Sequence, residues 1–170
     1  RDAIAEAFAR LSGALAEAVA DGGPAKALSV CSEKAPAIAN EVAALHGVSL
    51  RRAALRARNP KNRADAEEKA VLESFAAAMG KKEAPQPRVV GHADGSRSFY
   101  APIVLQNALC LQCHGAPERE VAPATLEAIR KRYPDDEATG YALGDLRGLW
   151  KVTFAAGPAS SDGEASVKPG

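Results

Sequence analysis

The chain has 170 residues, with 22 Lys and Arg against 21 Asp and Glu and a net charge of +1. This length is enough for one domain with a hydrophobic core. The balanced charge argues against a nucleic-acid partner, because no basic excess is present to neutralise phosphates, and no apolar run approaches the roughly 20 residues that span a membrane.

The first 46 residues carry apolar side chains at helical spacing and predict two helices. The segment Asp21-Gly22-Gly23 is expected to end the first helix, and Pro24 suits the first turn of the second. Cys31 lies on the apolar stripe of the second helix, which Pro36 is expected to bend or divide. Gly47 suits the C-terminal cap of this helix.

Next comes a segment, residues 48–58, whose pattern fits a helix or a strand equally well. Asn59-Pro60-Lys61-Asn62 predicts a turn, because a residue before proline avoids the helical region. Asp65 and Glu68 together predict the capped start of a third helix, which is expected to end near Gly80.

The second half of the chain changes from helical periodicity to alternation. The expected elements are a β-hairpin over residues 89–105 that turns at Asp94-Gly95, a short helix over residues 123–132, and a last strand through Trp150, Val152 and Phe154. These elements predict a single α+β domain over residues 1–156. The composition of residues 157–170 predicts a flexible tail.

The most informative segment is Cys110-Leu111-Gln112-Cys113-His114, a C-x-x-C-H motif typical of covalent, c-type haem attachment. Two thiols at this spacing can form thioethers with the two vinyl groups of one haem. The adjacent histidine can then bind the iron as the proximal ligand. The motif therefore predicts one covalently bound haem c, and Gly115 is expected to let the backbone pass close to the macrocycle.

Other interpretations of this motif are weaker. A zinc site needs a second pair of ligands at metal-binding spacing, and the only other cysteine is the distant Cys31. A thioredoxin-like redox pair needs a βαβ context, which the pattern does not show. A disulfide across two residues does not need His114.

Attachment of haem through such a motif is completed outside the cytoplasm, so we expect a bacterial periplasmic or other extracytoplasmic location. The chain begins at Arg1 without an apolar leader, as expected if a signal peptide or an anchor has been removed. In an oxidising compartment a spare thiol at Cys31 requires an explanation.

The sixth ligand of the iron has few candidates: Met79, His46, His92 and Cys31. Core packing accounts for Met79, helix capping for His46 and solvent exposure beside a turn for His92. Cys31 fits either a buried small side chain or a ligand that protects its own thiol. From residue chemistry alone these alternatives stay open.

Several motifs in a fixed order resemble the Tll0287-like (DUF3365) family of c-type haem sensor or cytochrome domains. The resemblance implies a PAS-like antiparallel sheet flanked by long N-terminal helices, a strand within residues 48–58, and a His/Cys ligand pair in which Cys31 is the distal ligand. The motifs that carry it are Val30-Cys31, Arg58-Asn59-Pro60-Lys61-Asn62, Tyr100-Ala101-Pro102-Ile103, the C-x-x-C-H-G segment, Tyr133-Pro134-Asp135-Asp136, Gly140-Tyr141 and Gly144-Asp145-Leu146-Arg147-Gly148.

We therefore expect a monohaem domain that senses redox state or a diatomic gas such as CO or NO, with a soluble low-potential electron carrier as the alternative. An enzyme is not expected, because no distal acid–base pair is evident. Haem propionates need cationic partners, and the sequence does not choose among Arg52, Arg56, Arg58, Arg97 and Arg147.

Overall fold

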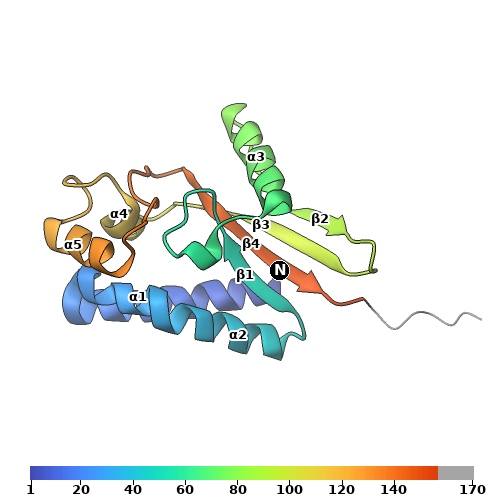
Figure 1. The fold of residues 1–170 in the computed structure, drawn as a ribbon, viewed down its shortest axis with the longest axis horizontal. Helices are drawn as coiled ribbons and strands as arrows, with labels where there is room; N and C mark the ends of the chain where they lie inside the picture. The colour runs from blue at the N-terminus through green and yellow to red at the C-terminus, as the bar shows by residue number, and fades with distance from the viewer. Residues whose placement is uncertain (157–170) are drawn as a thin grey trace, which may run out of the picture.

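A four-stranded antiparallel sheet forms the centre of the fold in the computed structural model, which describes residues 1–156 (Figure 1). The predicted tail, residues 157–170, lies outside the described residues. The strand order is β1-β4-β3-β2, so the last strand pairs with the first. The strands are β1 (Ser49–Ala53), β2 (Arg88–Gly91), β3 (Arg97–Val104) and β4 (Leu146–Phe154). The predicted hairpin, last strand and α+β class are confirmed, and residues 48–58 contain a strand as the resemblance implied.

The N-terminal helices α1 (Asp2–Ser29) and α2 (Ala35–Leu45) cover one face of this sheet (Figure 1). Within α1, Gly22 and Gly23 leave helical geometry, and Gly23 has a φ of 73°, which glycine adopts without strain. The predicted break between two helices is therefore present as a kink. The core beneath these helices consists of Ala3, Ala7, Val42, Ala43, Leu50, Trp150 and Val152.

A π-helical turn, η1 (Val30–Lys34), joins α1 to α2 and contains Cys31. The amide of Ala35 donates to the carbonyl of Val30, five residues earlier. In an α-helix this amide would donate to the carbonyl four residues earlier. Pro36 follows at once and has no amide hydrogen to donate to the preceding turn. The sequence predicted that Pro36 would bend or divide the helix. The structure instead has a wider, π-helical turn just before Pro36.

Helix α3 (Ala66–Gly80) packs on the opposite face of the sheet (Figure 1). The predicted start is confirmed, because Asp65 accepts from the amide of Glu68 while the Glu68 carboxylate accepts from the amide of Asp65. The apolar side of α3 buries Val71, Leu72 and Phe75 against Tyr100. This face therefore has its own core, separated by the sheet from that of α1 and α2.

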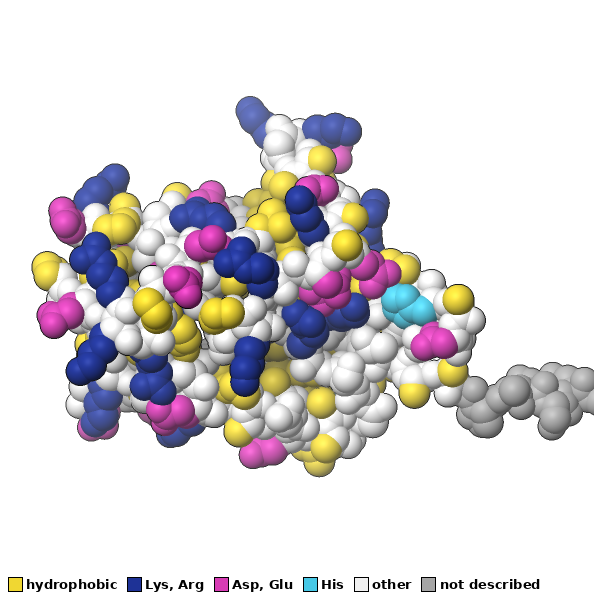
Figure 2. All heavy atoms as spheres, in the orientation of Figure 1, with side chains coloured by type: hydrophobic (Ala, Val, Ile, Leu, Met, Phe, Trp, Pro, Cys, Tyr) yellow, Lys and Arg dark blue, Asp and Glu magenta, His cyan; other side chains and the backbone are white. Residues whose placement is uncertain are grey.

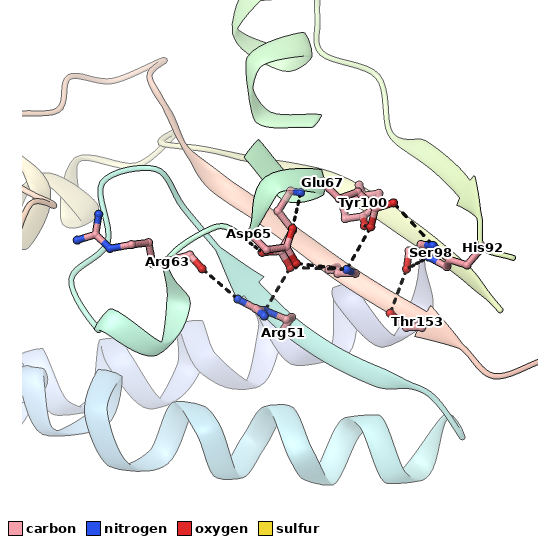
Figure 3. A network of polar contacts seen from close by, with 10 residues as sticks. Arg51, Arg63, Asp65, Glu67, His92, Ser98, Tyr100 and Thr153 are labelled. Atoms are coloured by element: carbon pink, nitrogen blue, oxygen red, sulfur yellow. Dashed lines mark hydrogen bonds and ion pairs between the residues drawn. The ribbon is translucent and has the colours of Figure 1, made fainter. Parts of the chain in front are cut away.

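A polar network surrounds the first turn of α3 (Figure 3). Glu68 is fully buried, with its Oε1 atom 3.3 Å from Nε of Arg51 and 3.8 Å from Nζ of Lys151. The hydroxyl of Tyr100 donates to Glu67 at 2.5 Å, and burial together with this bond raises the pKa of Tyr100. His92 lies 2.8 Å from the Ser98 hydroxyl, so the expectation that it is simply solvated is wrong. These contacts tie α3 to β1, β3 and β4.

Helices α4 (Ala108–His114) and α5 (Pro123–Arg132) lie together at one end of the sheet (Figure 1). The second of these confirms the short helix predicted over residues 123–132. Acidic and basic side chains are interspersed over the face drawn in Figure 2, in keeping with the balanced charge. Within residues 1–156, no helix is both long enough and apolar enough to cross a membrane.

Gly148 in β4 lies against the backbone of the neighbouring strand β1. A Cβ atom at this position would meet the carbonyl oxygen of Ala53 at 2.5 Å. We therefore expect Gly148→Ala to lower the free energy of unfolding by about 1–3 kcal/mol, because backbone must move to admit the methyl group. Gly13→Ala is the control: nothing lies within 4 Å of its Cβ in the middle of α1, and we expect a gain of about 0.5–1 kcal/mol. Urea denaturation of both variants measures the difference, and equal stabilities would contradict it.

Candidate cofactor site

One cavity brings together all four predicted site residues. Cys110, Cys113 and His114 line it from α4, and Cys31 lines it from η1. The rest of its lining comes from α1, from β1 and the residues that follow it up to Asn62, from the end of β3, from the start of β4, and from Tyr133 just after the last helix. Residues far apart in the chain therefore converge where the N-terminal helices meet the end of the sheet.

Local interactions fix the turn that carries the C-x-x-C-H motif. Asn107 caps α4 by accepting from the amide of Leu109. Gly115 follows His114 at a close approach of the chain, since a Cβ atom there would lie 2.6 Å from both the Leu111 carbonyl and the Glu120 side chain. The packing of the turn by itself therefore requires glycine at this position. This reason is separate from the close approach to a macrocycle that the sequence suggested.

The imidazole of His114 is oriented by the loop that precedes β4. The ring Nδ1 atom donates to the carbonyl of Ala138 at 2.7 Å. The backbone carbonyl of His114 accepts from the amide of Tyr141. Burial lowers the pKa of His114 well below its usual value, and the nearby cations Arg147 and Arg58 act in the same direction. The ring is therefore neutral with a lone pair on Nε2, which is the form that binds a metal.

Arg58 connects the C-x-x-C-H turn to the loop that contains Asp136. Its guanidinium donates to both carboxylate oxygens of Asp136 and, at 2.7 Å, to the carbonyl of Cys113. The side chains of Arg58 and Asp136 are only 7% and 8% exposed, so this is a buried ion pair. The sequence suggested Arg58 as a propionate partner, but its charge is already neutralised here, and the part played by Asp136 was missed.

The thiols of the cavity are held in an apolar setting. Burial raises the pKa of Cys113 to about 11, with Cys31 and Cys110 acting in the same direction and Arg58 opposing them. All three cysteines are half-buried and none forms a disulfide. A neutral thiol of this kind remains a thiol until a reaction or a metal removes its proton.

The structure separates Cys31 from the other candidates for a sixth ligand. None of Met79, His46 and His92 is among the residues that line the cavity in the described part of the chain. His46 pairs with Glu6 at 2.9 Å at the end of α2, and His92 belongs to the network beside α3. Met79 lies half-buried near the end of α3, outside the buried core to which the sequence assigned it.

Comparison with known proteins matches residues 2–155 to the Tll0287-like family. The chain belongs to this family. Among solved structures, this Tll0287-like chain is similar to "Crystal structure of the cyanobacterial heme-protein Tll0287" with a TM-score of 0.66 and 27% identity, covering 89% of this chain and 92% of that one. The comparison with curated proteins gives no match. The family resemblance deduced from the motifs is thus confirmed.

The donor set of this Tll0287-like domain fits a haem. Two thiols stand one helical turn apart beside an imidazole with a free Nε2, and a third thiol reaches the same cavity from another element. In addition, the Nε atom of Arg147, which also lines the cavity, is buried without a hydrogen-bond partner among the described residues. A bound group that carries carboxylates would supply that partner.

Proposed function

We propose that the domain is a monohaem c-type cytochrome module that acts as a periplasmic redox or diatomic-gas sensor and not as an enzyme. Cys110 and Cys113 would hold the haem through thioethers, His114 would be the proximal ligand and Cys31 the distal ligand. One observation carries the proposal: the cavity gathers Cys31 and the C-x-x-C-H motif while it leaves out every other candidate ligand. The similarity to a solved haem protein supports haem binding.

The haem would supply one-electron redox chemistry, and the protein would decide what reduction does to Cys31. An anionic thiolate stabilises ferric iron, so a domain with this ligand should have a low potential. Reduction weakens the attraction between iron and thiolate, which favours release of Cys31. Release would free one coordination position for CO or NO and detach η1 from the iron, so that a redox change biases a two-state element.

The proposal is tested on protein matured with haem in a periplasmic expression system. We expect haem staining of the denatured wild-type band and none for the Cys110→Ala/Cys113→Ala variant, because only thioethers survive denaturation. The ferric optical spectrum should be unaffected by CO, and the dithionite-reduced spectrum should change on its addition. A stained protein whose reduced form ignores CO would instead be a sealed, low-potential electron carrier. A band without haem would refute haem attachment altogether.

A further inference from the structure

The described residues that line the cavity include three arginines and neither aspartate nor glutamate. The three arginines are Arg52, Arg58 and Arg147, and Asp136 is the ion-pair partner of Arg58. No ion pair links Arg52 or Arg147 to a carboxylate within residues 1–156. Arg52 and Arg147 are half-buried in the cavity wall. Withdrawing a cation from water without a counter-ion is costly, so two such groups in one cavity require an explanation.

Arg147 approaches the cavity from the start of β4 with its hydrogen-bonding capacity largely unused. One terminal nitrogen donates to the carbonyl of Arg56 at 3.2 Å, while Nε is buried and has no partner within the described chain. The guanidinium lies 5.5 Å from the ring centre of Tyr141. Burial lowers the pKa of Arg147, and the cations Arg58 and Arg52 lower it further.

Arg52 enters the same cavity from β1. Its guanidinium lies over the ring of Trp150, 5.6 Å from the ring centre, where a cation–π contact holds it in place. Burial lowers its pKa, partly opposed by Cys31 and Tyr133. Because β1 and β4 are paired, with Ala53 opposite Leu149, the sheet fixes the positions of the two strand segments from which Arg52 and Arg147 extend.

The other arginines suggested by the sequence are engaged elsewhere. Arg56 does not line the cavity and donates to the carbonyls of Glu137 and Thr139. Arg97 is exposed and borders a different pocket beside Phe154. Arg58, as described above, is neutralised by Asp136.

We propose that Arg52 and Arg147 bind the propionate carboxylates of the haem and so set its orientation in the cavity. This assignment rests on the proposed function, because it requires the haem. A haem carries two carboxylates, and the cavity offers two guanidiniums that lack a counter-ion. Binding would complete the hydrogen bonds of Arg147 and neutralise both cations in surroundings where charge-assisted hydrogen bonds are strong. The two arginines would thus hold the haem by its edge without contacting the iron.

The test compares Arg52→Gln and Arg147→Gln with Arg97→Gln, a control that removes the same charge from the exposed part of β3. Two properties of the matured proteins are measured: the propionate bending bands in resonance Raman spectra, and the midpoint potential over the range where carboxylates titrate, about pH 4 to 7. In the wild type and the control, the propionates should stay ionised through the upper part of this range.

In each cavity variant a propionate that has lost its cation should have a raised pKa and should titrate within the range. Its ionisation as pH rises adds negative charge near the iron and favours the ferric state. The potential should therefore fall with pH more steeply than in the control, and the propionate bands should shift. Profiles and bands identical to those of Arg97→Gln, in proteins that stain for haem, would overturn the assignment.

Failure of the proposed function has a different signature, because the wild-type protein would then contain no haem. Should either Gln variant not mature, Arg52→Lys or Arg147→Lys replaces it, since lysine keeps the cation but not the planar fork. Shifted propionate bands with a wild-type dependence of potential on pH would then support the assignment. Unchanged bands would overturn it.

Discussion

Replacing Cys31 with alanine should convert the ferric protein from a six-coordinate, low-spin form to a high-spin form. Of the four side chains that could provide the sixth ligand, only Cys31 lines the cavity in the described part of the chain. An alanine cannot bind iron, and within the described residues no methionine, and no histidine other than His114, lines the cavity to replace the thiol. The optical spectrum of the ferric protein reports the spin state directly, and the change should be complete.

Met79→Leu and His92→Gln are the matched controls for this experiment, because they remove two of the three other candidate ligands without touching the cavity. Both should leave the ferric spectrum as in the wild type. A Cys31→Ala protein that remains low-spin, together with a change in one control, would move the sixth ligand to that residue. It would also remove the basis for a redox-driven release of η1.

Replacing Asp136 with asparagine should lower the free energy of unfolding by about 3–5 kcal/mol, a large part of the stability of a small domain. The substitution preserves size but leaves Arg58 as a buried cation without a counter-ion. Arg58 also donates to the carbonyl of Cys113, so the turn that carries both cysteines of the C-x-x-C-H motif should loosen with it. Urea denaturation of the matured protein measures the loss.

The neighbouring residue provides the control. Glu137 pairs with Arg63 at 3.0 Å, but both side chains are about half exposed, so solvent screens this pair. Glu137→Gln should therefore change the stability by no more than about 1 kcal/mol. If Asp136→Asn and Glu137→Gln lower the stability equally, the buried ion pair of Arg58 and Asp136 has no special part in holding the motif.

Local chemistry made much of this fold predictable. Three features depend on neighbours in the chain, and each is present as expected: the capping box of Asp65 and Glu68, the helix end at Gly47, and the turn over residues 59–62, which forms a short 3-10 helix at Pro60–Asn62. The C-x-x-C-H motif likewise specified three of the site residues within one turn. Such features need no knowledge of the rest of the molecule.

Features that depend on distant segments were not predictable in the same way. The partner of the His114 ring is a backbone carbonyl, that of Ala138, and a carbonyl leaves no signature in residue type. Arg58 and Asp136 could not be paired without knowing that their loops meet. The π-helical form of the turn around Cys31 could not be predicted from the spacing of apolar residues, because one extra residue only shifts the apolar stripe.

That extra residue has a geometric consequence. An α-helix advances about 100° per residue, so deleting one residue from η1 to restore regular α-helical bonding would rotate the preceding part of the helix by about that angle relative to α2. The segment between the Gly22–Gly23 kink and η1 includes Leu28, which packs against Val121 and against Leu126 and Ile129 of α5. The π turn therefore sets the rotation of one length of helix relative to the next, so that one faces the sheet and the other faces the end of the domain that carries the C-x-x-C-H motif.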